Sequence, residues 1–125
     1  MHLASRPPQS GPPTTAVEFG YNPPTGARGI ERINPATFVS DLAQVVEFSS
    51  GNFDSVWVSD HLMMADKFRL ECWTQLTWIA TRYPTLPLGT NVMSQTFHHP
   101  PLLGKMIASL QALRDADFRL GYGAG

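Results

Sequence analysis

The spacing of hydrophobic residues along the chain changes several times between the period of a strand and the period of a helix. Near the start, Val17, Phe19 and Tyr21 alternate with a charged residue and a glycine, which predicts a strand over 16–21. In the run 53–61, β-branched and aromatic side chains face both sides, which is typical of a parallel strand covered on both faces. Two further strands are predicted over 86–92 and 118–122.

Three helices are predicted between these strands, because apolar residues there recur three and four positions apart. The first begins after an Asn34 cap with proline at the first helical position, and Gly51 is placed to end it. The second is predicted over about 71–83, and Pro101 opens the third. The predicted inward faces are Phe38, Leu42, Val45, Val46 and Ser49; then Trp73, Leu76, Thr77 and Ala80; then Leu103, Met106, Ile107, Leu110 and Leu113.

The order of these elements predicts a parallel sheet. Each interval between successive strands contains one helix, which is the pattern of a strand, a crossover helix and a parallel strand. Right-handed crossovers place the helices on the same side of a curling sheet. The predicted fold class is α/β, of the (β/α)8 TIM-barrel type, and the chain holds the first four strand-helix units, a half barrel.

Composition divides the chain into two parts. Residues 1–15 contain four prolines and almost nothing apolar, so they are predicted to be a disordered proline-rich arm. Residues 16–125 are predicted to be the N-terminal half of a barrel domain. The chain has 125 residues, of which 42% are hydrophobic, and this is enough for one small domain and too few for two.

Charge and cysteine content exclude several function classes. The formal charge is -1 and no basic cluster exists, which argues against nucleic acid and acidic membrane surfaces as partners. The single cysteine, Cys72, excludes an internal disulfide and a Cys-rich zinc site, and we expect it to pack in the core. Without a long apolar run or a signal-peptide core, the protein is predicted to be cytoplasmic and not to span a membrane.

The first candidates for chemistry are Asp60 and His61, which end the predicted strand 53–61. Ligands of α/β sheets bind at the carboxyl ends of the strands. An imidazole at such a place can take the proton of an alcohol hydroxyl while a hydride leaves the carbon that bears this hydroxyl. The alternative is that this acid and this histidine only cap the following turn.

Other polar and sulfur-containing residues give weaker signals. His98 and His99 are candidate metal ligands together with His61. Adjacent histidines are poorly directed to one ion, however, so we predict no metal site. The glycine-rich segment 121–125 resembles a phosphate-binding loop, yet no helix follows it. The larger apolar residues predicted to serve packing are Trp73, Trp78, Met63, Met64 and Met106.

The chain contains five motifs in a fixed order: residues 54–61, Trp73-Thr74 with Leu76, residues 88–92, His99-Pro100 with Lys105-Met106, and residues 120–125. Their order and spacing resemble those of the luciferase-like flavin-dependent monooxygenase family, and the resemblance covers roughly 17–125. The Ser59-Asp60-His61 ending is most similar to the deazaflavin-using branch of that family.

This resemblance implies an oxidoreductase whose cofactor ring lies across the carboxyl ends of barrel strands, with deazaflavin (coenzyme F-420) expected over FMN. It implies that Asp60 binds the ring and that His61 is the proton-transferring catalytic group beside a small-molecule substrate. A non-proline cis peptide is expected between Asn91 and Val92, and Ser94 would also contact the ring. Asp60, Asn91, Val92 and Ser94 are therefore the expected cofactor-binding residues.

The chain also departs from the family pattern. The branch that oxidises sugar phosphates has a tryptophan four residues after the histidine, where this chain has Ala65, so a sugar phosphate substrate is not supported. Relatives continue past the fourth strand into a catalytic acid and four more units, whereas this sequence stops at Gly125. We therefore expect the fragment itself to be inactive, and to be aggregated or a weakly stable homodimer.

Two alternatives to hydride transfer remain open from the sequence. One is a non-enzymatic half barrel that acts only through assembly. The other is a metal-dependent hydrolase using Asp60, His61 and His99.

Overall fold

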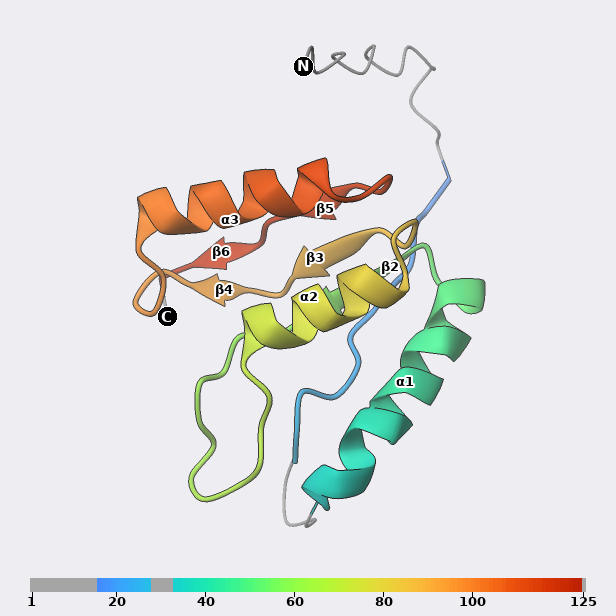
Figure 1. Cartoon of the computed structure of the whole chain (residues 1–125), viewed down its shortest axis with the longest axis vertical. Coiled ribbons are helices and arrows are strands. Elements are labelled where there is room, and N and C mark those ends of the chain that lie inside the picture. The colour runs from blue at the N-terminus through green and yellow to red at the C-terminus, as the bar shows by residue number, and fades with distance from the viewer. Residues whose placement is uncertain (1–15, 28–32, 125) are drawn as a thin grey trace.

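The structure, a computed structural model, describes residues 16–27 and 33–124, so the predicted disorder of 1–15 lies outside the described residues. Figure 1 shows helices and short strands following one another along the chain. None of the described helices is long and apolar enough to cross a membrane. The helices are α1 (Pro35–Asn52), α2 (Cys72–Arg82) and α3 (Pro100–Ala112). The strands are β1 (Gly20–Tyr21), β2 (Ser55–Val58), β3 (Leu88–Thr90), β4 (Met93–Ser94), β5 (Phe118–Arg119) and β6 (Tyr122–Gly123).

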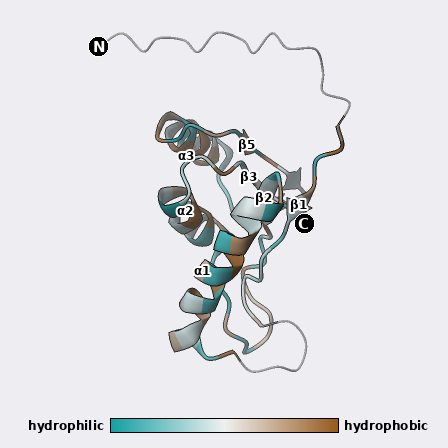
Figure 2. Cartoon of the chain, turned by 90° about the vertical axis from the view of Figure 1, so that its right-hand side faces the viewer, coloured by the Kyte–Doolittle hydropathy of each residue, from teal (hydrophilic) through white to brown (hydrophobic). Residues whose placement is uncertain are grey.

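The predicted parallel sheet is confirmed. Its four strands have the order β1-β2-β3-β5 and all pair in parallel. β4 and β6 form a second parallel pair that follows β3 and β5 along the chain. Figure 2 shows α1, α2 and α3 together on one side of these strands, as right-handed crossovers require. The closed barrel is not tested by four strands and stays a prediction, as does the expected homodimer.

The start of α1 is as predicted, and its end is not. The Asn34 side chain accepts a hydrogen bond from the Ala36 amide at 3.0 Å, and the inward face is buried along Phe38, Leu42 and Val46. The helix does not end at Gly51 but runs to Asn52. It stops because the next residue, Phe53, is extended and packs its ring 5.1 Å from that of Tyr21.

The inward faces of the other two helices differ from the prediction by part of a turn. In α2 the buried residues include Cys72 and Ile79, while Trp73 and Thr77 are only half-buried at the side of the helix. α3 begins at Pro100, one residue before the predicted Pro101, and its buried residues are Leu103 and Leu110. Leu113 lies beyond the helix end and is 81% exposed, so its predicted core position is wrong.

The strands are shorter than the apolar pattern predicts. Val17 and Phe19 are 75% and 65% exposed, so only the end of the predicted first strand pairs in the sheet. The predicted strand 118–122 is divided into β5 and β6 by Leu120 and Gly121. A side chain at Gly121 would collide with the Thr90 carbonyl oxygen, which would lie 2.2 Å from its Cβ. The predicted strand is therefore interrupted at Gly121, where its backbone passes close to the end of β3.

One indole fills the face of the sheet opposite the helices. Trp57 lies on β2 between two glycines of the neighbouring strands, Gly20 on β1 and Gly89 on β3. A Cβ at Gly20 would lie 2.3 Å from the indole Nε1, and one at Gly89 would lie 2.6 Å from Cε3. The indole N–H donates to the Ser55 hydroxyl at 2.9 Å. Only glycine at both neighbours leaves room for the ring to lie flat across three strands.

Gly89→Ala is therefore expected to lower the free energy of unfolding by about 1–3 kcal/mol, the usual cost of overpacking a filled core. The matched control is Gly104→Ala in α3, where an added Cβ would meet nothing within 4 Å. That control should raise stability by about 0.5–1 kcal/mol, because glycine is a poor helix former. Urea unfolding followed by circular dichroism measures both, and an unchanged midpoint for Gly89→Ala would contradict the packing of Trp57.

Candidate functional site

A cavity of about 690 Å³ opens at the carboxyl ends of β2 and β3. Its size is in the range of small-molecule and cofactor sites. It brings together all five residues that the sequence singled out, namely Asp60, His61, Asn91, Val92 and Ser94. The remaining lining residues are Leu62, Met63, Thr96 and Phe97.

The pairing of β2 with β3 explains why these residues meet. Val58 pairs with Thr90 at the end of both strands, and the Asn91 amide donates to the Val58 carbonyl at 2.9 Å. The residues that follow each strand therefore leave the sheet at the same edge. The expected cis peptide between Asn91 and Val92 is present at this edge.

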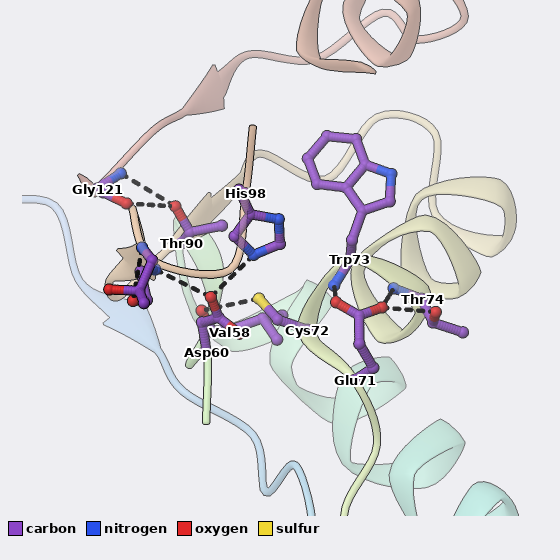
Figure 3. A network of polar contacts seen from close by, with 11 residues as sticks. Val58, Asp60, Glu71, Cys72, Trp73, Thr74, Thr90, His98 and Gly121 are labelled. Carbon is purple, nitrogen blue, oxygen red and sulfur yellow. Dashed lines mark hydrogen bonds and ion pairs between the residues drawn. The ribbon is translucent and has the colours of Figure 1, made fainter. Parts of the chain in front are cut away.

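The Asp60 carboxylate is almost fully buried, with 3% of its side chain exposed. Its Oδ2 atom accepts the Ser94 amide at 2.9 Å and lies 3.0 Å from Nε2 of His98 (Figure 3). An ionised carboxylate can only accept, so the histidine Nε2 carries the proton and donates it. Asp60 therefore ties the end of β2 to the segment that follows β4.

His61 has the opposite environment. It is exposed on the pocket wall, and within the described part of the chain its imidazole makes no hydrogen bond. Neighbouring residues of an extended chain point in opposite directions, which separates this imidazole from the buried Asp60 carboxylate. His61 is therefore open to a ligand in the cavity, whereas Asp60 is part of the wall.

Apolar side chains form much of the rest of the pocket. Leu62, Met63, Val92 and Phe97 are between 48% and 77% exposed, although they line a cavity. The prediction that Met63 serves core packing is wrong, because this residue is 77% exposed. A concave site with an apolar lining and a few polar groups suits a flat, mostly apolar ring.

Glu71 lies next to this pocket and caps α2. One of its carboxylate oxygens accepts the Trp73 amide at 2.8 Å, and the other accepts the Thr74 amide at 2.8 Å and the Thr74 hydroxyl at 2.7 Å. Burial acts to raise the pKa of Glu71, but these hydrogen bonds, helped by the charge of His98, lower it below its ordinary value. The carboxylate therefore stays ionised at neutral pH.

Cys72, the residue after Glu71, is buried, and its Sγ lies 3.9 Å from the Val58 carbonyl oxygen. Burial, with the nearby charges of Asp60 and Glu71, raises the pKa of this thiol to about 12. The thiol is therefore protonated at neutral pH and is not a nucleophile. This agrees with the prediction that Cys72 packs in the core.

The acid and imidazole groups that the structure assembles are not those of the predicted metal alternative. Among the described residues, Asp60, Glu71 and His98 each offer one ligand atom, and these atoms lie within 4.8 Å of one another. His61 and His99 are not part of this cluster. Its oxygen atoms already accept the hydrogen bonds of Ser94, His98 and the first turn of α2. We interpret the cluster as a hydrogen-bonded network rather than a ligand set.

Sequence reasoning found five of the pocket residues but missed the contact between Asp60 and His98. The sequence pattern indicates His98 only as a candidate metal ligand beside His99. The two side chains are separated by 38 residues, and no local spacing indicates which of two adjacent histidines turns inward. His99 became the cap position of α3 and makes no side-chain cap hydrogen bond.

Comparison with known proteins gives a consistent result. A family model described as luciferase-like monooxygenase matches residues 17–125. An F420-dependent glucose-6-phosphate dehydrogenase from Kineococcus radiotolerans is 30% identical over 84 residues, which are 64% of this chain and 25% of that protein. An F420-dependent glucose-6-phosphate dehydrogenase from Nakamurella multipartita is 29% identical over 113 residues, which are 87% of this chain and 31% of that protein. The chain thus spans less than a third of the length of these relatives.

The cap of α2 gives a stability prediction. Glu71→Ala is expected to lower the free energy of unfolding at neutral pH by about 0.5–2 kcal/mol, the usual cost of losing a helix cap. Because the pKa of Glu71 is lower in the folded chain than in the unfolded one, its stabilisation is complete above the ordinary value of 4.5 and is lost as the pH falls through the lowered pKa. The difference between parent and variant should therefore shrink in acid.

Urea unfolding at a series of pH values measures this difference. Gln44→Ala, at an exposed position of α1, is the control and should change stability little at any pH. A difference between Glu71→Ala and the parent that stays constant down to strongly acidic solution would show that the ionised carboxylate is not what caps the helix.

Proposed function

This chain belongs to the luciferase-like monooxygenase family, and we propose that it forms the cofactor-binding part of a deazaflavin-dependent oxidoreductase. The observation that carries this proposal is the cavity of about 690 Å³, in which Asp60, His61 and Ser94 meet an apolar wall at the carboxyl ends of β2 and β3. The reaction is hydride transfer between a small-molecule substrate and the cofactor.

The pocket residues fit a deazaflavin ring in shape and chemistry. The exposed apolar side chains of Met63, Val92 and Phe97 offer contact surface for a flat ring, and the bend at Asn91 brings backbone to the same wall. Both curated relatives are named as F420-dependent, which supports deazaflavin over FMN. In the proposal, Asp60, Asn91, Val92 and Ser94 hold the ring, and the bound cofactor supplies the hydride acceptor or donor.

His61 is the proposed catalytic residue. Its imidazole is exposed to the cavity, so it can take the proton of a substrate hydroxyl while a hydride leaves the carbon that bears this hydroxyl. The buried Asp60 is not placed to do this, since its Oδ2 atom already accepts two hydrogen bonds. The two neighbouring residues therefore have separate tasks, with proton transfer at His61 and cofactor binding at Asp60.

The proposed substrate is a small molecule other than a sugar phosphate. Ala65 stands where the sugar-phosphate-oxidising branch has tryptophan, and its methyl group offers no aromatic face to a sugar ring. Ala65 is also exposed and has a positive φ of 56°, a conformation that bulky residues rarely adopt. The names of the two relatives support the proposed dehydrogenase reaction, and the substrate is expected to differ from the one they name.

The assignment of roles is tested in the full-length gene product. His61→Ala is expected to lower kcat by about 10²- to 10⁴-fold with deazaflavin affinity little changed, because a general base is lost. Asp60→Ala should mainly weaken deazaflavin binding. Steady-state kinetics and fluorescence titration measure the two effects, and His99→Ala is the control because His99 is exposed outside the pocket. If rate and titration both survive the two substitutions, the site is wrong.

The cofactor class is tested separately. The full-length gene product is expected to bind deazaflavin more tightly than FMN, and addition of a chelator should leave its activity unchanged. Titration with each cofactor and an assay after dialysis against chelator measure these outcomes. Activity that disappears with chelator and returns with zinc would instead favour a metal-dependent hydrolase, with Asp60, Glu71 and His98 as ligands in place of the Asp60, His61 and His99 of the sequence alternative.

A further inference from the structure

The buried Asp60 carboxylate depends on a partner that does not line the main cavity. A buried charge is unfavourable unless hydrogen bonds and an opposite charge compensate it. Of the two donors to Oδ2, the Ser94 amide belongs to β4, and the other is the His98 imidazole. His98 is therefore the only side chain of the described residues that donates to Asp60.

His98 lies at a second, smaller cavity and close to two acids. Its side chain is 14% exposed, and it lines a smaller cavity of about 230 Å³ together with Glu71, Trp73 and His99. Figure 3 shows the imidazole above Asp60, with the Glu71 carboxylate that caps α2 to one side, and one ligand atom of each of the three lies within 4.8 Å of the others. The Cys72 thiol nearby is neutral, so the charges that face the imidazole are the two carboxylates. Both carboxylates can accept a hydrogen bond, and Asp60 accepts the one from Nε2.

The hydrogen bonds of Asp60 with Ser94 and His98 also position the wall of the main cavity. Asp60 holds Ser94 through its backbone and His98 through its side chain, and Thr96 and Phe97 between them line the main cavity. Within this segment the Ser94 hydroxyl accepts the Thr96 amide at 3.3 Å. The wall is thus anchored at both ends by a single carboxylate oxygen.

We propose that His98 is a positioning residue for the cofactor pocket, which fixes the Asp60 carboxylate and the wall segment 95–98 by donating Nε2–H to Oδ2. The proposal rests on the proposed function for the identity of the bound cofactor. Its core, the coupling of His98 to Asp60 and to the Ser94 amide, holds in the protein without cofactor.

The first test is a double-mutant cycle in the full-length gene product, with the deazaflavin dissociation constant as the measurement. His98→Ala should raise this constant by about 10- to 100-fold, the range found when a residue that orients a ligand-binding side chain is removed at metal sites. His98→Gln should recover most of the affinity, because its side-chain amide still offers a donor. In an Asp60→Ala background, His98→Ala should have no further effect, since its action passes through Asp60.

The matched control is His99→Ala, which removes the adjacent, exposed imidazole and should leave the dissociation constant unchanged. A loss of affinity of the same size in the parent and in the Asp60→Ala background would overturn the proposal, because His98 would then act independently of Asp60. Failure of His98→Gln to recover more affinity than His98→Ala would also overturn it.

A second measurement needs no cofactor. Hydrogen exchange of the Ser94 amide, followed by NMR, should be about tenfold faster in His98→Ala than in the parent or in His98→Gln. Unchanged exchange would overturn the positioning role. If instead the exchange responds as expected but the parent binds no deazaflavin, the proposed function fails and the role of His98 in holding Asp60 stands.

Discussion

The structure depends on the pairing of β2 with a parallel strand on each side, with helices against one face of the sheet and the indole of Trp57 on the other. Val56 and Val58 are fully buried against the helices, and Trp57 covers the opposite face by lying over glycines of the two neighbouring strands. Because the indole spans all three strands, β1, β2 and β3 are held in one register. The residues that follow β2 and β3 are therefore brought to the same edge, where the pocket forms.

The neighbouring residues Asp60 and His61 acquire opposite environments at this edge. An extended chain turns successive side chains to opposite sides. One side leads under the segment after β4, where the Asp60 carboxylate is buried and hydrogen-bonded, and the other leads into the cavity, where His61 is exposed. A single strand end thereby supplies a fixed charge in the wall and an accessible imidazole. The proposed function uses the two groups separately, one to hold the cofactor and one to move a proton.

Local signals in the sequence account for what could be predicted. The Asn34 cap and the buried run of β2 are encoded by residues next to one another, and strand order follows from one helix between strands. The sequence could not show that Gly51 stays helical or that Leu113 is exposed, because the position of the neighbouring segments decides both. The pairing of Asp60 with His98 was missed for the same reason, since it joins segments that meet only after the sheet has formed.

The hydrogen bonds of Asp60 with Ser94 and His98 connect the main cavity to residues outside it. The Asp60 side chain, whose Oδ2 atom accepts hydrogen bonds from Ser94 and His98, is only 3% exposed, so a change in these donors is expected to reach the pocket through the carboxylate. Glu71 is held in place by the first turn of α2, and its carboxylate is the second negative charge close to the His98 imidazole. In the proposed function, the affinity for deazaflavin would therefore depend on the N-terminus of α2 and on His98, neither of which lines the main cavity.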